Sequence, residues 1–295
     1  MGPTIVAPAA IASPAGTWVP LAMLSDEQLA EFDRAGFVRL PAIVPEGDCA
    51  RIRESLWSAL AAHGIARGDR ATWTVVQPRH LQALRRAGAL DAIAPPALSG
   101  AIDDLLGPGA WERPRHWGEP LVSFPVPGEA WRLPRSVWHI DWPAHGAARP
   151  PFGVKVLACA ADVVPLGGGT LVVAGSHRLV SRFLAERPRT APVGSRKMRG
   201  ALVRSYDWFR DLCSDSGSNG AVADRAERFM SESAVLDGVA VRVVELTGAA
   251  GDVVLFHPWL FHAPSQNCAR EPRLVIGHNV QTPRALAVYA GKPLP

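Results

Sequence analysis

The chain is poor in lysine, and it also lacks paired cysteines and long apolar runs. Its 295 residues carry a formal net charge of +4, and arginine accounts for almost all of the excess, because Lys155, Lys197 and Lys292 are the only lysines. The arginines of residues 51–86 are interleaved with apolar and acidic residues, whereas a DNA-binding protein usually gathers its basic residues on one stripe. We therefore expect no nucleic-acid partner.

The four cysteines lie far apart and form no C-x-x-C pair. This spacing excludes the common structural zinc patterns and gives no sign of a disulfide framework. No stretch approaches the roughly 18 uninterrupted apolar residues of a membrane helix. Residues 1–24 have no basic start and contain several prolines, which is not typical of a signal peptide. We expect a cytoplasmic protein without a membrane partner, in which residues 1–24 form a flexible extension.

Helical patterns come first in the chain, and strand patterns follow. Ser25 and Gln28 have the capping-box spacing that begins a helix over 25–35, and apolar residues recur at helical spacing over 46–63. Proline and glycine punctuate 95–128, for which we expect loops and short strands. Strand-like apolar runs then cover 152–160, 170–174, 239–246, 252–256 and 273–280. The pattern predicts one domain over 25–295: N-terminal helices and a β-barrel that is interrupted by a long insertion over 178–236.

The strongest chemical signal is the pair His139 and Asp141 in the stretch WHID. Residues i and i+2 of an extended strand project to the same face, so the two side chains could meet one ion. An imidazole and a carboxylate are two of the three ligands in the facial triad that binds non-haem Fe(II). The third ligand must come from another strand. His257 and His262 are both candidates, because each follows a strand-like run.

Arg273 stands eleven residues beyond His262. A guanidinium binds a carboxylate through two parallel hydrogen bonds, so a fixed arginine near iron suits a dicarboxylate co-substrate. The spacing to Arg273 favours His262 over His257 as the third ligand.

Four stretches resemble, in order, the phytanoyl-CoA dioxygenase family of Fe(II)- and 2-oxoglutarate-dependent oxygenases: LSDEQLAEFDRAGFVRLPAIV, WHID, GGGTLVVAGSH, and GDVVLFHPWLFHAPSQN followed by Arg273. The resemblance implies a mainly β fold, the double-stranded β-helix or cupin-like jelly roll, with flanking helices. It also implies that His139, Asp141 and His262 bind iron and that Arg273 holds the C5 carboxylate of 2-oxoglutarate. Thr170 is a further candidate for contact with the co-substrate.

The implied enzyme uses Fe(II), 2-oxoglutarate and O2 to oxidise a C–H bond, most often by hydroxylation. We expect a small hydrophobic metabolite as the substrate, of the kind made in bacterial specialised biosynthesis. The run VKVLACAAD departs from the tryptophan-containing strand of the family, so contacts to the C1 carboxylate do not transfer. Two alternatives stay open: a cupin-type metalloenzyme that does not use 2-oxoglutarate, and a non-catalytic module that binds 2-oxoglutarate or metal.

Several aromatic residues are candidates for substrate contact. Five tryptophans cluster around WHID: Trp111, Trp117, Trp131, Trp138 and Trp142. Trp138 and Trp142 should face away from the metal, because their strand parity is opposite to that of His139. Trp117 and Trp131 are therefore the substrate candidates of this group, and Asn279 joins them because it shares the face of Arg273, whereas His278 does not.

The insertion 178–236 is too long for a barrel turn, and long connections in compact domains are often lids. Its middle is rich in glycine and serine, and Tyr206 and Trp208 stand before that middle. We expect this segment to fold over the iron. The two aromatic side chains would then close on an apolar part of the substrate, and some of its arginines would meet an anionic part.

Overall fold

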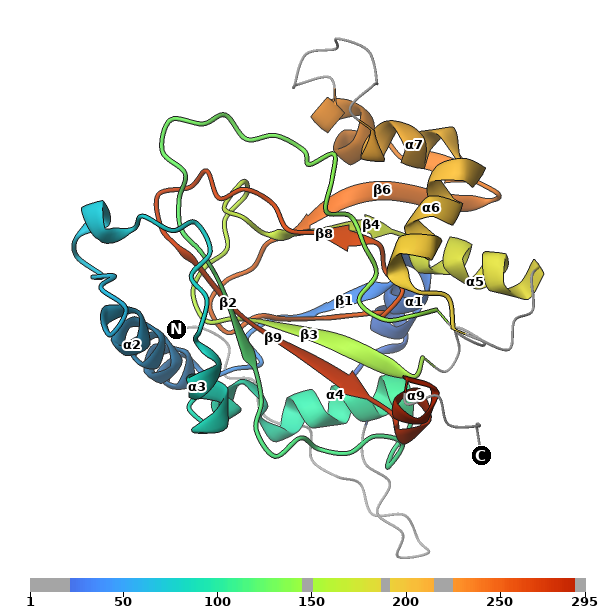
Figure 1. Cartoon of the computed structure of the whole chain (residues 1–295). Coiled ribbons are helices and arrows are strands. Elements are labelled where there is room, and N and C mark those ends of the chain that lie inside the picture. Colours follow the sequence, from blue (N-terminus) through green and yellow to red (C-terminus); the bar gives the residue numbers. More distant parts are fainter. Residues whose placement is uncertain (1–21, 145–150, 187–191, 215–224, 290–295) are drawn as a thin grey trace, which may run out of the picture.

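The computed structural model describes residues 22–144, 151–186, 192–214 and 225–289 of the chain. Two antiparallel sheets form its centre (Figure 1). The larger sheet has the strand order β1-β7-β3-β9-β2, and the smaller sheet has the order β5-β6-β4-β8. This arrangement confirms the expected double-stranded β-helix with flanking helices.

The strand-like runs of the sequence are strands of these sheets. The larger sheet contains β1 (Phe37–Leu40), β2 (Glu119–Ser123), β3 (Gly153–Cys159), β7 (Val253–Phe256) and β9 (Arg273–Gln281). The smaller sheet contains β4 (Thr170–Ala174), β5 (Ala234–Leu236), β6 (Val239–Leu246) and β8 (His262–Ala263). Three polar residues that matter below are the first residues of strands: Thr170 of β4, His262 of β8 and Arg273 of β9.

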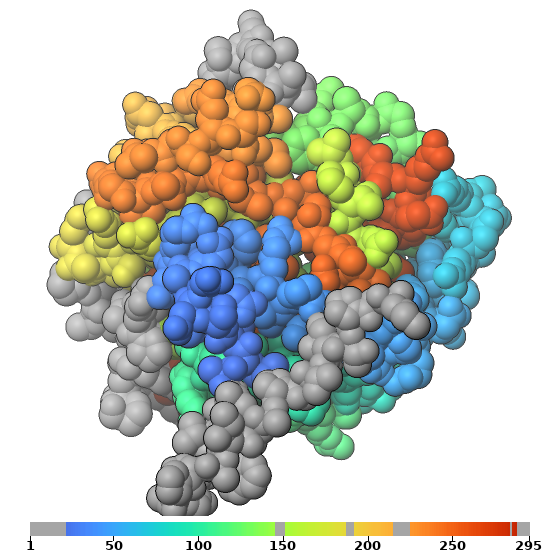
Figure 2. All heavy atoms as spheres, turned by 180° about the vertical axis from the view of Figure 1, so that it is seen from behind, coloured from blue at the N-terminus to red at the C-terminus, as the bar shows by residue number. Residues whose placement is uncertain are grey.

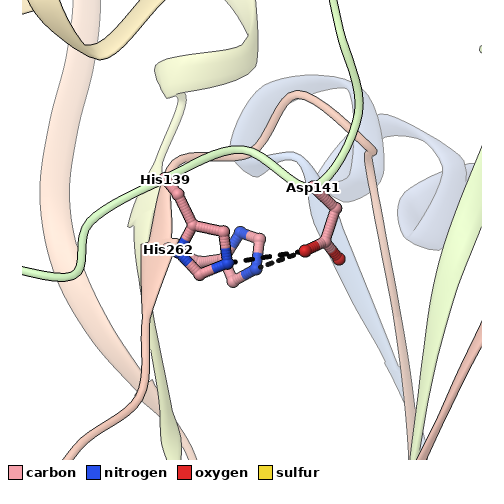
Figure 3. A group of neighbouring side chains, drawn as sticks. All are labelled: His139, Asp141 and His262. Atoms are coloured by element: carbon pink, nitrogen blue, oxygen red, sulfur yellow. Dashed lines mark ion pairs between the residues drawn. The ribbon is translucent and has the colours of Figure 1, made fainter. Parts of the chain in front are cut away.

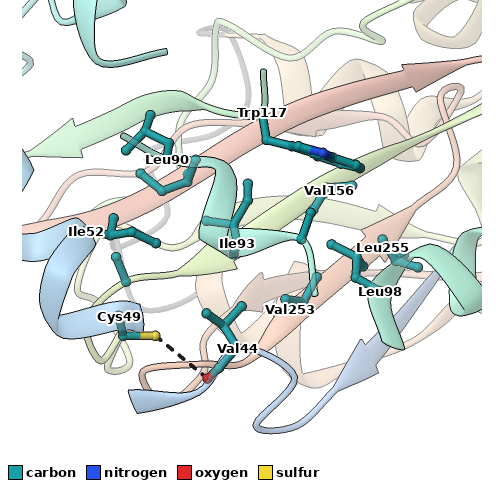
Figure 4. Packing of buried hydrophobic residues seen from close by; sticks show 14 of the residues in the cluster. Val44, Cys49, Ile52, Leu90, Ile93, Leu98, Trp117, Val156, Val253 and Leu255 are labelled. Atoms are coloured by element: carbon teal, nitrogen blue, oxygen red, sulfur yellow. Dashed lines mark hydrogen bonds between the residues drawn. The ribbon is translucent and has the colours of Figure 1, made fainter. Parts of the chain in front are cut away.

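Helices from the N-terminal part of the chain cover the outer face of the larger sheet. They are α1 (Asp26–Ala35), α2 (Glu46–Ala61), α3 (Gln82–Arg86) and α4 (Pro96–Leu106). Figure 4 shows how Ile52 of α2 and Leu98 of α4 pack with Val156 and Leu255 of the sheet. The predicted capping box is present, since Ser25 accepts from the backbone N–H of Gln28 while the Gln28 side chain accepts from that of Ser25. Seen from behind, helix α1, in blue, lies beside α5 (Ser176–Glu186), in yellow (Figure 2).

The insertion contributes helices to the outer face of the smaller sheet. They are α5 (Ser176–Glu186), α6 (Ser195–Ser205), α7 (Asp207–Cys213) and a π-helical turn (Glu227–Ser231), and α9 (Pro283–Tyr289) follows the last strand. Phe209 of α7 and Leu202 of α6 are buried with Val173 of β4. Part of the insertion therefore belongs to the folded core.

A third apolar cluster fills the space between the two sheets. It joins Leu157 of β3 and Val254 of β7 to Val172 of β4. Because side chains alternate along a strand, the residues of β3 that share this inner face with Leu157 are Lys155 and Cys159. Arg273, Val275 and three further positions of β9 share the same face by parity. The candidate site described below lies on this inner face, in a cavity that opens to solvent.

Two expectations are wrong in detail. Residues 96–106 form helix α4, although the prolines suggested loops. Pro95 and Pro96 occupy the N-cap and first helical positions, where proline needs no N–H donor and its fixed φ suits the helix. His139 is not on a regular strand either, since it makes an isolated bridge with His262 within an extended loop.

The expected N-terminal extension lies outside the described residues, except for its last three positions. There Leu24 is buried, and the backbone N–H groups of Met23 and Leu24 donate to the carboxylate of Asp104 at 2.7 and 2.8 Å. The Gly/Ser-rich middle of the insertion also lies largely outside the described residues, so the lid stays a prediction. Among the residues that the structure describes, no helix has the length and apolar character needed to cross a membrane.

Candidate metal centre and co-substrate pocket

The structure brings the side chains of His139, Asp141 and His262 together (Figure 3). One donor atom of each lies within 4.8 Å of the other two. The Nε2 atoms of His139 and His262 are 3.5 and 3.4 Å from the same oxygen, Oδ1 of Asp141. Ligand atoms that meet one ion at about 2.1 Å and at right angles are about 3 Å apart. The two histidine–aspartate separations therefore exceed the spacing of ligands on one metal ion by only about 0.5 Å.

Backbone hydrogen bonds place the two histidines beside each other. The N–H of His139 donates to the carbonyl of His262 at 2.9 Å, and the N–H of His262 donates back at 2.9 Å. His262 also pairs with Val172 of β4, so the smaller sheet fixes both residues. The residue before it, Phe261, donates its backbone N–H to the buried hydroxyl of Ser176 at 2.9 Å.

A carbonyl oxygen faces the Nδ1 atom of each histidine. Nδ1 of His139 is 2.8 Å from the carbonyl of Val137, and Nδ1 of His262 is 2.8 Å from that of Leu260. Because a carbonyl only accepts, each Nδ1 carries a proton, so a neutral ring has its lone pair on Nε2. Both Nε2 atoms face Asp141: a neutral ring can bind a metal there, and a protonated ring donates a hydrogen bond to the carboxylate when no metal is bound.

The electrostatics keep Asp141 ionised. Burial alone would raise the pKa of this carboxyl, but hydrogen bonds from His139 and His262 and the charge of Lys155 hold its pKa well below its usual range. Nζ of Lys155 is 2.5 Å from Oδ2, the oxygen that does not face the histidines. The hydrogen bond to Asp141 raises the pKa of His139, whereas burial lowers the pKa of His262.

Arg273 lies in the same cavity and is buried. Its Nη2 donates to the Thr170 hydroxyl at 3.0 Å, so the two predicted co-substrate residues are in contact. Its Nε is buried and, within the part of the chain that the structure describes, has no hydrogen-bond partner. Burial lowers the pKa of Arg273 to about 10, so the side chain stays charged at neutral pH. A buried guanidinium with an unused donor fits the carboxylate of a dicarboxylate ligand.

The cavity has a volume of about 260 Å³ and opens to solvent. It contains all three candidate metal ligands, together with Arg273 and Thr170. Its apolar lining is Pro78, Pro120, Leu121, Val122, Leu157, Phe256 and Pro264, and its other polar lining is Gln77, Arg79, Ser123 and Lys155. The cavity therefore has room for a small dicarboxylate beside the metal ligands and continues toward the surface.

His257 does not reach this site. Its ring lies 6.2 Å from Phe32 and 5.0 Å from His177, between centroids, at the side where α1 packs. The structure therefore places His262, and not His257, with His139 and Asp141. His278 faces the other side of β9, as expected, and its Nδ1 accepts from the backbone N–H of Gly118 at 3.1 Å.

The predicted substrate residues do not line the cavity. Trp117 is buried on the outer face of the larger sheet, 4.8 Å from the His278 ring between centroids. Trp131 packs against the cluster of the smaller sheet, and Trp208 is buried in it beside Phe209. Tyr206 donates its hydroxyl to Asp237 at 2.6 Å. Asn279 is exposed and lies opposite Lys155 in the pairing of β9 with β3.

Sequence reasoning missed two charged residues of the cavity, Lys155 and Arg79. Lys155 is the one charged residue in the apolar run 152–160, which was a usable signal, because a charge within a buried strand needs a partner. Arg79 gave no signal, because residues 73–80 have neither helical nor strand periodicity. This loop reaches the cavity because the N–H of Phe124 donates to the carbonyl of Val76 at 2.8 Å.

Solved structures with a similar fold have low sequence identity to this chain. EctD from S. alaskensis, with 2-oxoglutarate and 5-hydroxyectoine, has a TM-score of 0.51 and 18% identity over 90% of this chain and 79% of its own. AviO1 from Streptomyces viridochromogenes Tue57 has a TM-score of 0.50 and 17% identity over 91% of this chain and 97% of its own. The α-ketoglutarate-dependent epimerase SnoN from nogalamycin biosynthesis has a TM-score of 0.50 and 17% identity over 87% of this chain and 80% of its own. These similarities show the fold.

A search of curated proteins finds no match. The sequence profile of the phytanoyl-CoA dioxygenase family, in contrast, matches residues 32–275, which is most of the chain and includes every candidate ligand as well as Arg273. This match confirms the expected enzyme class, an Fe(II)- and 2-oxoglutarate-dependent dioxygenase. The chain belongs to the phytanoyl-CoA dioxygenase family.

Proposed function

We propose that this protein oxidises a C–H bond of a small organic molecule at a metal centre held by His139, Asp141 and His262. Hydroxylation is the commonest result of such an oxidation. One observation carries the proposal: the three donor atoms lie within 4.8 Å of one another in the same cavity as Arg273, a buried arginine with an unused donor. When bound, iron with 2-oxoglutarate and O2 supplies the oxidising power, and succinate and CO2 are the by-products.

Each residue has a separate task in this proposal. His139 and His262 bind the metal through Nε2, and Asp141 binds it through Oδ1. Arg273 holds the distant carboxylate of 2-oxoglutarate through its free donors, while Thr170 keeps the guanidinium in place. Because the guanidinium is buried, its charge–charge contact is screened little by solvent, which makes the preference for a dicarboxylate strong.

The expected substrate is a small molecule with an apolar part. Leu157, Phe256 and Pro264 supply apolar surface in the cavity. Specialised bacterial metabolites fit this size and character, and they remain our proposal for the substrate class. We also place the enzyme in the cytoplasm, and its four cysteines, all free, suit a reducing compartment.

Conversion of 2-oxoglutarate to succinate tests the proposal. The purified protein is incubated in air with Fe(II) and 2-oxoglutarate for several hours, because turnover without the native substrate is slow. We expect succinate from the wild type and from His257→Ala, but not from His262→Ala or from a reaction without Fe(II). His257→Ala is the matched control, since it removes a buried histidine from the same chain segment.

The same assay addresses the cupin-type alternative. An enzyme of that type binds Fe(II) through the same three residues but leaves 2-oxoglutarate unchanged. Protein that binds Fe(II) tightly and produces no succinate above the protein-free rate would contradict our proposal and favour that alternative.

A further inference from the structure

The cavity contains more positive charge than the proposed reaction uses. Its charged lining residues are Arg79, Lys155 and Arg273 on the positive side and Asp141 on the negative side. Fe(II) and the dianion of 2-oxoglutarate add charges that cancel, so the excess remains after both have bound. A cavity with an uncompensated positive charge favours an anionic partner.

Lys155 lies on a different side of the metal ligands from Arg273. The register of the sheet pairs Lys155 with Asn279 and pairs Arg273 with Ser123, so the two basic side chains start six residues apart along β9. At about 3.3 Å per residue, this separation is about 20 Å. Arg273 extends to Thr170 in the smaller sheet, whereas Lys155 extends to Asp141. One 2-oxoglutarate C5 carboxylate cannot use both cations.

Lys155 also has unused hydrogen-bonding capacity. An ammonium has three donors, and the structure shows one of them used, by Oδ2 of Asp141. Two neighbours of Lys155 on the inner face are apolar, Phe256 directly opposite on β7 and Leu157 two residues on, while the exposed Asn279 lies opposite it on β9. Its side chain is 19% exposed and lines the cavity. Arg79 stands at the mouth, exposed, and makes no ion pair with a described residue.

We propose that Lys155, assisted by Arg79 at the cavity mouth, binds a carboxylate or similar anionic group of the substrate on the side of the metal ligands away from Arg273. The inference rests on the proposed function, because it assigns the substrate end of that site. Arg79 attracts the anion at the entrance, and Lys155 holds it beside the metal while its link to Asp141 fixes the ammonium. The substrate then combines an apolar body, which lies against Leu157 and Phe256, with one anionic end.

Acetate and acetamide are suitable probes, because they have the same size and differ in charge. The wild-type protein is loaded with Mn(II) and saturated with 2-oxoglutarate, which occupies Arg273 and the metal. Broadening of the probe methyl signal by the paramagnetic ion is then measured by NMR, with Zn(II)-loaded protein as the diamagnetic reference. We expect acetate to be broadened about tenfold more than acetamide, as a hydrogen bond to a charged group implies.

Substitution identifies the side chain responsible. Lys155→Met should abolish the preference for acetate, and Arg79→Met should weaken it. Lys197→Met is the matched control, because Lys197 is exposed on α6 and does not line the cavity; it should leave the preference intact. Equal broadening of the two probes in the wild type, or an unchanged preference in Lys155→Met, would overturn the inference.

Two further outcomes separate this inference from the proposed function. If Lys155→Met weakens 2-oxoglutarate binding and leaves the acetate preference unchanged, Lys155 serves the co-substrate, and the inference is wrong while the function stands. If wild-type protein loaded with Mn(II) does not bind 2-oxoglutarate at all, the proposed function itself fails.

Discussion

In each of the two candidate metal-binding histidines, one backbone carbonyl determines which ring nitrogen is left to bind a metal. The carbonyls of Val137 and Leu260 occupy the two Nδ1 atoms, which leaves both Nε2 atoms for a metal. Val137 adopts a φ of 62°, in the left-handed region that a β-branched residue rarely occupies. Strain of this kind persists where the surrounding structure enforces it, and here it accompanies the orientation of His139.

The buried guanidinium of Arg273 leads to a prediction about co-substrate affinity. Arg273→Met should weaken 2-oxoglutarate binding by about 2–5 kcal/mol, because it leaves a carboxylate without its partner. Thr170→Val should have a smaller effect, about 1 kcal/mol, since it removes one hydrogen bond that holds the guanidinium. Calorimetric titration of Mn(II)-loaded protein with 2-oxoglutarate measures both. Metal affinity should not change, and equal 2-oxoglutarate affinity in Arg273→Met and wild type would show that another residue binds the co-substrate.

His278 leads to a prediction about pH. Burial, with help from the charges of Arg85 and Lys155, lowers the pKa of His278 from 6.5 to about 4. The unfolded chain therefore binds more protons than the folded chain in this range, so stability is complete above about pH 6.5 and is lost as the pH falls toward 4. The expected loss from this residue between pH 7 and pH 5 is roughly 2 kcal/mol.

Urea unfolding of His278→Asn measures this contribution. Asparagine can still accept the N–H of Gly118 but does not titrate, so the variant should lose less stability than wild type between pH 7 and pH 5. His63→Asn, at an exposed position, is the control and should behave like wild type. The same pH dependence in His278→Asn and wild type would exclude His278 as the source.

Strand β3 lies at the centre of the larger sheet, where we expect substitutions to destabilise the protein. It pairs with β7 on one side and β9 on the other, and it presents Lys155 and Leu157 to the cavity. At its start, Gly153 leaves room for the indole of Trp142: a Cβ there would lie 2.3 Å from the ring and 2.5 Å from the carbonyl of Val280. The backbone atom cannot move aside without disturbing the β3–β9 pairing.

Gly153→Ala should therefore destabilise the protein by about 1–3 kcal/mol, as overpacking of a core does. Thermal or urea unfolding measures the change. Gly68→Ala is the control, because a Cβ at Gly68 meets nothing within 4 Å, and it should alter stability by less than about 0.5 kcal/mol. A Gly153→Ala variant as stable as wild type would mean that the indole of Trp142 has free space to move.

The elements that the sequence predicted are those with a strong local pattern. The capping box of α1 and the apolar runs of β4 and β6 depend on neighbouring residues alone, and their predicted bounds agree closely with the structure. Helix α4 was missed because proline is read as a breaker unless its position in the helix is known. The three candidate metal ligands, which the structure brings together, were predictable from the H-x-D spacing and the family resemblance. Trp117 and Trp208, in contrast, show that aromatic content alone cannot separate core from cavity.

At the scale of the whole molecule, the two sheets bring together residues from distant parts of the chain. His139 lies in a loop before β3, Thr170 begins β4, and Arg273 begins β9, so chain positions more than a hundred residues apart line one cavity. The outer faces of the sheets are covered by helices that build two separate apolar clusters. This core does not depend on the candidate ligands, so we expect their variants to fold.

Anaerobic titration of the Fe(II)-loaded protein with 2-oxoglutarate, followed by visible absorption, tests the central claim most directly. Chelation of Fe(II) by the 2-oxo acid gives a visible band, which depends on both the metal site and Arg273. We predict this band for wild type and for His257→Ala, its loss in His262→Ala with the fold retained, and a much higher 2-oxoglutarate requirement in Arg273→Met. A wild-type protein that forms no band at saturating 2-oxoglutarate, or a band that survives in His262→Ala and disappears in His257→Ala, would contradict the account.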